Sequence, residues 1–184
     1  MKDGIRLFVA STLTDDIKAL LQIQAQLYRN PAVRIIPDQN LHLTLFFIGN
    51  TPASNLETIK ESVQQTAKDH SAFNLNYLCT EPGPNPSAPR LIWARFVQHP
   101  EFEKLSRHLA TVLSPVQNAR QKPIPHITLA RYKKDTPLPH QIRVQHADPG
   151  LSINVNSISL WQSELASPHP VYRVLETYAL AAKL

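Results

Sequence analysis

The sequence predicts an α+β fold of antiparallel sheets, arranged as two pseudo-two-fold related lobes with helices on the outer faces and a central cleft. Three observations lead to this prediction. The strand and helix patterns follow one another in an order that mixes hairpins with crossovers, not in a regular alternation. The same His-x-Thr-Leu strand occurs at positions 42 and 126, at comparable places in two similar β/α stretches. Only four glycines are present, and the Gly-x-Gly-x-x-Gly fingerprint of a dinucleotide-binding parallel sheet is missing.

The first quarter of the chain predicts a strand, a helix and two further strands. Residues 5–10 form an apolar run rich in strand formers. Thr14 is the expected N-cap of the helix, because its side-chain oxygen can accept a hydrogen bond from an N–H group of the first turn. Residues 33–36 predict a short strand and residues 41–48 a longer one. The apolar residues at helical spacing are Ile17, Leu20, Leu21, Leu27 and Tyr28.

The middle of the chain predicts two more helices and two strands. The second helix opens with Pro52 at its first helical position, where an N–H is not needed. Residues 73–79 alternate as a half-buried strand, whereas residues 81–89 carry four prolines and predict a loop. A strand over residues 90–97 then precedes a third helix near Pro100. The inward-facing residues are Leu56, Ile59, Val63 and Ala67 in the second helix and Phe102, Leu105, Leu109, Val112 and Leu113 in the third.

The last part of the chain, after the second histidine motif, predicts a long loop and two strands. Residues 133–150 are rich in proline and histidine and have no period, so we expect an extended loop. Residues 151–161 predict a strand whose apolar parity shifts between Val155 and Ile158, which indicates a bulge or a break. Residues 171–180 predict the final strand.

The charge of the chain is compatible with a polyanionic partner. The formal net charge is +5 and the sequence pI is about 9.5. Within the segment 120–143, only Asp135 opposes the basic side chains. We expect this segment to lie at the cleft mouth and hold phosphates of such a partner, and the alternative is a solvated basic loop. The basic residues are Arg120, Lys122, Arg131, Lys133, Lys134 and Arg143.

Length, cysteine content and hydropathy predict the class of protein and its compartment. A chain of 184 residues with 42% hydrophobic content is long enough for a core, and we expect one bilobal domain over residues 1–184. Cys79 is the only cysteine, so an intrachain disulfide is excluded and a reducing compartment is expected. The sequence has neither a signal peptide pattern nor an apolar run of 18 residues. We therefore expect a cytoplasmic monomer with no membrane partner.

The two His-x-Thr-Leu strands each place a histidine and a threonine on one face. Successive side chains on a strand point to opposite faces. His42 and Thr44 therefore share a face, while the leucines that alternate with them anchor the strand in a core. His126 and Thr128 repeat this arrangement. Two chance matches of this kind are expected in roughly one or two of a thousand such sequences, so the duplication favours a function.

Two imidazoles on opposite sides of one reacting centre form an acid/base pair, since their ordinary pKa makes both protonation states available near neutral pH. Thr44 and Thr128 can donate hydrogen bonds to oxygens that gain charge, and a guanidinium can neutralise them. This set fits phosphodiester hydrolysis or transfer. A metal site is disfavoured, because no acidic cluster or His-Glu-x-x-His accompanies His42 or His126. The alternatives are an RNA-binding module without catalysis and histidines that only pack in strands.

The chain resembles the 2H phosphoesterase superfamily, and within it the RNA 2′,3′-cyclic phosphodiesterases, also called 2′-5′ RNA ligases. The similar segments are Arg6-Leu7-Phe8-Val9-Ala10, Asn40-Leu41-His42-Leu43-Thr44-Leu45 followed by Phe47-Ile48-Gly49, and Pro125-His126-Ile127-Thr128-Leu129-Ala130-Arg131. The resemblance implies cofactor-free and metal-independent hydrolysis of an RNA or nucleotide 2′,3′-cyclic phosphate to a 2′-phosphate. It also implies reversible, ATP-independent 2′-5′ ligation in some members. His42 is implied as the proton donor, His126 as the proton acceptor, and Arg131 as a phosphate ligand. Another cyclic phosphate or a 2′-5′ linked oligonucleotide is the alternative substrate.

Two further residues of the expected site depend on the path of the motif strands. Arg131 lies an odd number of residues after His126, so an ideal strand would point it to the opposite face. We therefore expect the strand to end or bulge near Ala130, or Arg131 to reach the substrate from outside. Phe47 is the preferred residue for stacking on a base. The other aromatic candidates are Phe8, Trp93 and Tyr132.

Overall fold

The computed structural model describes residues 4–85, 87–113, 122–134, 136, 144–146 and 151–182. The strands are β1 (Gly4–Ser11), β2 (Val33–Ile35), β3 (Leu43–Pro52), β4 (Phe73–Gly83), β5 (Leu91–Phe96), β6 (His126–Tyr132), β7 (Gln145–His146), β8 (Ser152–Val155), β9 (Ser157–Glu164) and β10 (Val171–Ala179). The helices are α1 (Asp15–Gln26), α2 (Leu56–Lys68) and α3 (Pro100–Leu113), with short 3-10 turns at Asp38–Asn40 and Ala53–Asn55.

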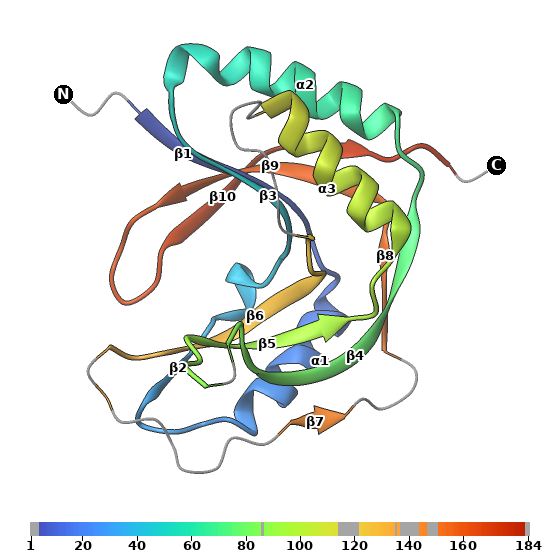
Figure 1. The fold of residues 1–184 in the computed structure, drawn as a ribbon. Coiled ribbons are helices and arrows are strands. Elements are labelled where there is room, and N and C mark those ends of the chain that lie inside the picture. The colour runs from blue at the N-terminus through green and yellow to red at the C-terminus, as the bar shows by residue number, and fades with distance from the viewer. Residues whose placement is uncertain are drawn as a thin grey trace.

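The strands form two antiparallel sheets, which we name the β1 sheet and the β6 sheet. The β1 sheet has the order β10-β9-β1-β3, and the β6 sheet has the order β2-β6-β5-β4-β7 with β8 pairing with β4. Helices α2 and α3 pack side by side over the β1 sheet, and α1 packs against the β6 sheet (Figure 1). The predicted α+β class with two antiparallel sheets is confirmed.

One hydrophobic core extends under both motif strands. Leu43 and Leu45 of β3 and Ile127 and Leu129 of β6 are all buried in the same cluster. This burial follows from the alternation of each strand, since the side chains between the polar positions point away from them. The apolar faces of β3 and β6 therefore rest on a shared core, while the histidine faces are turned away from it.

Each motif strand contains a β-bulge directly after its threonine. In β6, Thr128 lies opposite Trp93 and Ala130 lies opposite Ile92, so Leu129 is the extra residue. In β3, the register against β1 shifts in the same way after Thr44. A bulge reverses the parity of the residues that follow it. Ala130 accordingly points away from the face that carries His126 and Thr128, and it packs with Val33 and Ile92 in a separate small cluster.

The loop predicted for residues 81–89 is wrong at its start, because β4 continues to Gly83. Pro82 lies opposite Ile92 of β5 and is part of the strand. Proline lacks the N–H of a ladder hydrogen bond and is confined to the edges of sheets. In the described part of the chain, the other side of β4 pairs with β7 only at Cys79 and Thr80, so β4 is an edge strand where Pro82 stands.

Three other elements differ in detail from the predictions. The helix expected from Pro52 begins at Leu56, because β3 extends to Pro52 and a 3-10 turn follows. Val112 is 41% exposed, although an inward orientation was predicted. The predicted loop 133–150 contains the short strand β7, and most of its other residues lie outside the described part of the chain.

Several local predictions are confirmed. Thr14 is the N-cap residue of α1 by position, although its side chain makes no cap hydrogen bond. Cys79 is a buried free cysteine in β4. The predicted break lies at Asn156, between β8, which pairs with β4, and β9, which pairs with β1 and β10. The chain thus passes from one sheet to the other at this break. None of the described helices is long and apolar enough to cross a membrane.

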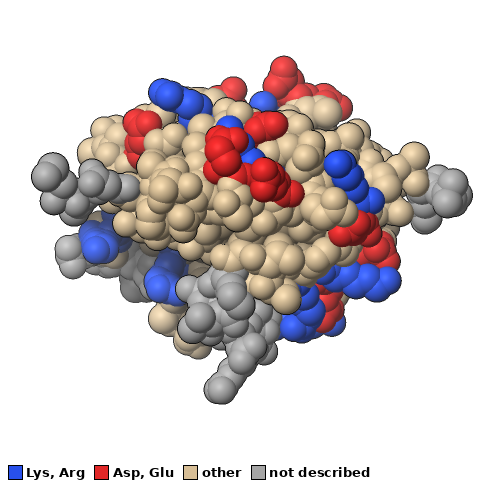
Figure 2. All heavy atoms as spheres, turned by 90° about the horizontal axis from the view of Figure 1, so that it is seen from above, with Lys and Arg blue, Asp and Glu red and all other residues tan. Residues whose placement is uncertain are grey.

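The surface formed by α2 and α3 carries charges of both signs. Figure 2 shows this face, where acidic and basic side chains lie interspersed. Ion pairs one helical turn apart account for part of the mixture, such as Lys60–Glu57 at 2.9 Å and Lys104–Glu101 at 2.8 Å. This face therefore presents no single-sign field for a polyanion.

Candidate active site

A cleft lined by β3 and β6 contains all six residues that the sequence analysis selected. His42, Thr44 and Phe47 line it from the β1 sheet, and His126, Thr128 and Arg131 line it from the β6 sheet. Further walls come from Arg34 of β2, and from His169 and Tyr172 of the β9–β10 connection and β10. Both strands offer their polar faces to this cleft because their apolar faces are held in the shared core.

The two imidazoles are held in the same way. His42 Nδ1 lies 2.7 Å from the carbonyl oxygen of Asn40, and His126 Nδ1 lies 2.7 Å from that of Ile124. A carbonyl oxygen only accepts hydrogen bonds, so Nδ1–H is the donor in both histidines. This contact leaves Nε2 of each ring as the nitrogen that can take up or release a proton.

His42 lies in an aromatic environment. Its ring centroid is 5.0 Å from Phe8, 5.3 Å from Tyr172 and 5.6 Å from Trp161. Burial lowers the pKa of His42 to about 4, and the charges of His126 and Arg131 act in the same direction. The hydrogen bond to the carbonyl of Asn40 raises the pKa but is outweighed. His42 is therefore neutral at pH 7 in the free protein.

His126 has a more cationic environment. Its ring centroid lies 4.8 Å from that of Trp93. Burial lowers the pKa of His126, and Arg95 and Arg131 lower it further by charge repulsion, while the hydrogen bond to the carbonyl of Ile124 opposes these effects. Arg95 is itself held by Glu81, at 2.7 Å between Nη1 and Oε1. His126 is thus also favoured in its neutral form, beside two guanidinium groups.

Gly83 permits the position of the indole beside His126. A Cβ atom added at Gly83 would lie 2.4 Å from Cε2 of Trp93, so no larger residue fits without moving the ring. This close approach requires β4 to continue beyond Pro82 along β5. The segment that was predicted as a loop therefore supports the wall of the cleft behind His126.

The bulges decide which residues join the histidines in the cleft. Arg131 lines the cleft together with His126 because the parity of β6 reverses at the bulge. Phe47 lines it on β3 for the same reason, and it stands five residues after His42 as Arg131 stands five after His126. Phe47 is 57% exposed, in contrast to the buried rings of Phe8 and Trp93. Tyr132 packs beside the small cluster around Ala130.

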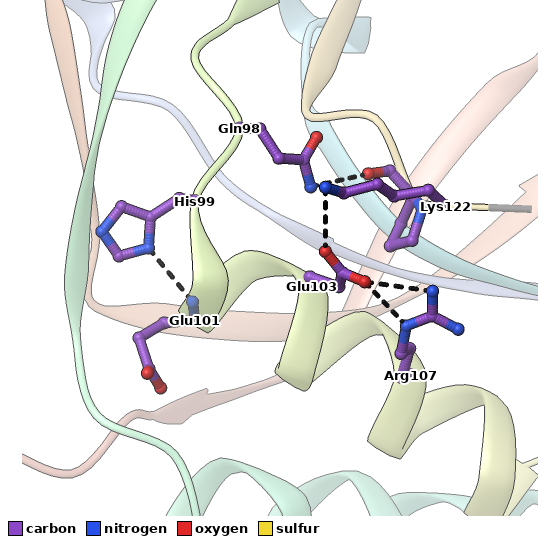
Figure 3. Close-up of polar contacts among 7 residues, drawn as sticks. Gln98, His99, Glu101, Glu103, Arg107 and Lys122 are labelled. Atoms are coloured by element: carbon purple, nitrogen blue, oxygen red, sulfur yellow. Dashed lines mark hydrogen bonds and ion pairs between the residues drawn. The ribbon is translucent and has the colours of Figure 1, made fainter.

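Contacts with α3 hold the segment that leads into β6. The Gln98 side-chain amide donates a hydrogen bond to the carbonyl of Pro123 at 3.1 Å (Figure 3). Glu103 pairs with Lys122 at 3.5 Å and with Arg107 at 3.0 Å. Ile124, whose carbonyl holds His126, follows directly. These contacts fix the backbone just before the second histidine.

The predicted basic segment is only partly described. Lys122 lies beside Glu103, so its charge is compensated, while Lys133 and Lys134 are exposed just after β6. Arg120 and Arg143 lie outside the described residues. Arg131 is the member of this segment that lines the cleft.

Several cleft residues lie far from the motifs and were not predicted from the sequence. Arg34, His169 and Tyr172 belong to no recognisable motif, and only the pairing of β2 with β6 and the β9–β10 hairpin bring them to the cleft. Asn40 was missed as well, although its place two residues before His42 offered a signal. In the described part of the chain, no group of three or more His, Cys, Asp or Glu side chains is placed to hold a metal ion.

Known proteins are similar to this chain over most of its length. An RNA 2′,3′-cyclic phosphodiesterase from Thermus thermophilus is 31% identical over 96% of this chain and 90% of its own length. One from Archaeoglobus fulgidus is 26% identical over 95% of this chain and 99% of its own. A crystal structure of a Thermus thermophilus protein has a TM-score of 0.85 at 28% identity, covering 97% of this chain and 100% of that one.

The apo structure of E. coli LigT is a further structural relative. It has a TM-score of 0.76 at 26% identity and covers 97% of this chain and 98% of its own. The sequence also matches the 2′-5′ RNA ligase superfamily over residues 12–166, which include both histidine motifs and the cleft residue Arg34 of β2. The fold similarity and the family match agree, and we conclude that the chain belongs to the 2′-5′ RNA ligase superfamily of 2H phosphoesterases.

Proposed function

We propose that this protein hydrolyses RNA 2′,3′-cyclic phosphate to a 2′-phosphate, without a metal ion, by acid/base catalysis between His42 and His126. The observation that carries the proposal is the pair of imidazoles held alike through Nδ1 in one cleft, which leaves each Nε2 for proton transfer. The names of the relatives support the substrate class. E. coli LigT, 25% identical to this chain, has been crystallised with phosphate, which supports phosphate binding by a protein of this fold.

In the proposed reaction, water attacks the phosphorus of the cyclic phosphate. His126 Nε2 accepts a proton from this water, and the bond between phosphorus and the 3′-oxygen breaks. His42 Nε2–H donates its proton to the departing 3′-oxygen, so the products are a 2′-phosphate and a free 3′-hydroxyl. Each transfer of this kind typically contributes ~10²–10⁴-fold to the rate. A second turnover requires that the proton return from His126 to His42 through solvent.

The low pKa of His42 in the free protein requires that the substrate promote its protonation. The cyclic phosphate carries a negative charge, and an opposite charge within a few ångström raises the pKa of an imidazole. The substrate thereby also opposes the repulsion by Arg131 that contributes to the low pKa of His42. A general acid works best when its pKa lies near the operating pH, so a pKa of His42 that the bound phosphate raises from about 4 toward neutrality suits protonation of the departing 3′-oxygen.

Three other side chains are proposed to bind the phosphate. Thr44 and Thr128 donate hydrogen bonds to its non-bridging oxygens, one from each motif strand, and Arg131 neutralises the charge that develops on them. Their places on the polar faces of β3 and β6 support these roles. Phe47 is proposed to stack on the base, since its exposed ring stands at the cleft on the same strand as Thr44.

The same groups can catalyse 2′-5′ ligation. In that reaction the 5′-hydroxyl of a second RNA takes the place of water, His126 accepts its proton, and His42 protonates the 3′-oxygen. A 2′-5′ phosphodiester forms as the bond to the 3′-oxygen breaks. ATP is not needed, because the strained cyclic phosphate is the activated group.

The deciding experiment is hydrolysis of a nucleoside 2′,3′-cyclic phosphate in the presence of EDTA, with separation of the 2′- and 3′-phosphate products. We expect the 2′-phosphate to be the product and the rate to be unchanged by chelation. Formation of the 3′-phosphate would contradict the assigned leaving group. Loss of activity with EDTA and recovery with Zn²⁺ or Mn²⁺ would contradict the metal-independent mechanism.

A further inference from the structure

Two arginines face each other across the strands β2 and β6. Arg34 is the direct cross-strand partner of Arg131 in the antiparallel ladder, so both side chains lie on the same face. Both line the cleft that contains the two histidines. Like charges at directly opposite positions destabilise a sheet, and Cβ atoms at such positions are only about 4.5–5.5 Å apart. A pair of this kind needs an anion or a carboxylate close by to offset the repulsion.

The described residues supply no carboxylate for this pair. Neither Arg34 nor Arg131 takes part in an ion pair with a described Asp or Glu, and no acidic side chain is among the described residues that line the cleft. Other basic residues do have such partners, for example Arg95 with Glu81. The positive charge of the cleft is thus left for a ligand.

The two guanidinium groups serve different parts of the cleft. The charge of Arg131 acts to lower the pKa of His42, of His126 and of Tyr172. The charge of Arg34 instead acts to lower the pKa of His169. Arg131 therefore lies at the reacting centre, and Arg34 lies at the end of the cleft formed by the β9–β10 connection. This difference separates two places where an anion can bind.

The backbone of the β9–β10 connection orients Arg34. Its Nη1 donates a hydrogen bond to the carbonyl of Pro168, and the Asn40 side chain donates one to the carbonyl of Pro170 at 2.9 Å. These two bonds close one end of the cleft with the β9–β10 connection. A guanidinium has five N–H donors, so one bond to Pro168 orients Arg34 and leaves others for a ligand.

We propose that Arg34 and His169 form a second phosphate subsite, which binds the phosphate on the 5′ side of the nucleotide whose cyclic phosphate is hydrolysed. The inference rests on the proposed function, and it assigns the substrate class as a 5′-phosphorylated nucleotide or an oligonucleotide rather than an unmodified nucleoside cyclic phosphate. One nucleotide then spans the two arginines, with its reacting phosphate at Arg131 and its 5′-phosphate at Arg34. Arginine suits this role because its planar fork binds phosphate oxygens in pairs.

The test compares three substrates by kcat/KM: adenosine 2′,3′-cyclic phosphate, its 5′-phosphorylated form, and the dinucleotide ApA 2′,3′-cyclic phosphate. We expect the wild-type protein to prefer the 5′-phosphorylated forms at least about tenfold, as one hydrogen bond to a charged group contributes. Arg34→Gln should reduce this ratio to near one. Arg29→Gln, which removes an exposed arginine outside the cleft, is the matched control and should leave the ratio intact. If only the dinucleotide is preferred, the subsite binds an internucleotide phosphate. If the 5′-phosphorylated mononucleotide is preferred as well, the subsite binds a terminal 5′-phosphate and an internucleotide phosphate alike.

A binding measurement keeps the inference independent of turnover. Titration calorimetry with 2′-AMP and adenosine 2′,5′-bisphosphate should show at least about tenfold tighter binding of the bisphosphate, and Arg34→Gln should abolish this difference. The inference is overturned if the wild-type protein binds the two ligands equally tightly. It is also overturned if Arg34→Gln weakens the binding of both ligands by the same factor, because an Arg34 that only holds the β9–β10 connection in place would affect both ligands equally. Absence of hydrolysis with an intact binding preference would instead contradict the proposed function alone.

Discussion

The two motif strands have the same backbone design and different surroundings. At the start of both β3 and β6, a histidine donates Nδ1–H to the carbonyl two residues before it, a threonine follows two residues later, and a bulge comes next; His42 directly precedes β3 and His126 is the first residue of β6. Five residues after the histidine, however, β3 presents Phe47 and β6 presents Arg131. His42 lies among aromatic rings, whereas His126 lies beside Trp93 and two arginines. Equivalent backbones thus build an apolar wall and a cationic wall.

This difference allows two equivalent motif strands to take different parts in the reaction that we propose. Acid/base catalysis at one phosphorus needs one protonated and one neutral imidazole at the same moment. Two identical environments would favour the same protonation state in both rings. Because burial is the main cause of the low pKa of both histidines and the neighbouring groups differ, their responses to a bound anion differ as well.

The strongest test of the comparison removes each imidazole in turn. His42→Ala and His126→Ala should each lower turnover at least ~10²-fold while the protein remains folded. A substrate whose leaving group needs no protonation should restore activity to His42→Ala and not to His126→Ala. Rescue of His126→Ala instead would exchange the two roles. The control is His146→Ala, which removes an exposed histidine outside the cleft and should retain full activity.

The next test contrasts the residues at the equivalent positions after the bulges. Arg131→Gln should lower kcat/KM roughly 10²-fold on all cyclic phosphates, because each hydrogen bond to a charged oxygen contributes about 1.5–3 kcal/mol. Phe47→Leu should lose about 1–3 kcal/mol through weaker stacking, and more with purine than with pyrimidine substrates. Steady-state kinetics on adenosine and uridine 2′,3′-cyclic phosphates measures both effects. A base-dependent loss in Arg131→Gln and a uniform loss in Phe47→Leu would contradict the assignment of the two walls.

A smaller effect is expected at the threonines, where the two strands are equivalent. Thr44→Val and Thr128→Val keep the shape of the side chain and remove the hydroxyl. Each should cost about one hydrogen bond to a charged oxygen, roughly tenfold in kcat/KM. Similar losses in the two variants would support symmetric phosphate contacts. A normal rate in either variant would show that its hydroxyl does not bind the phosphate.

The smallest effect concerns stability against acid. The unfolded chain protonates His42 near pH 6.5, whereas the folded protein does so only near pH 4. Between these values the unfolded state binds more protons, so the free energy of unfolding falls as the pH falls through this window. His42→Gln should weaken this decline by about 1–2 kcal/mol, measured by urea unfolding at pH 7 and pH 4.5. An unchanged slope would mean that His42 is protonated equally in both states. His146→Gln serves as the control.

Much of this protein can be predicted from local sequence patterns. The alternation around His42 and His126 indicated which face of each strand carries the polar groups, and the order of strands and helices indicated the α+β class. The parity shift between Val155 and Ile158 located the passage from one sheet to the other. Such features are accessible because strand alternation and helical spacing depend on residues close together in the chain.

Other features depended on which strands pair and in what register. The cluster of four prolines suggested a loop, yet Pro82 continues β4 because the edge position there tolerates a missing N–H. Arg34 reaches the cleft only because β2 pairs with β6, and Arg131 faces it only because a bulge reverses the strand parity. The low pKa of His42 arises from burial among aromatic rings on β1, β9 and β10. These features join residues far apart in the sequence, and packing between the two sheets, not local spacing, decides them.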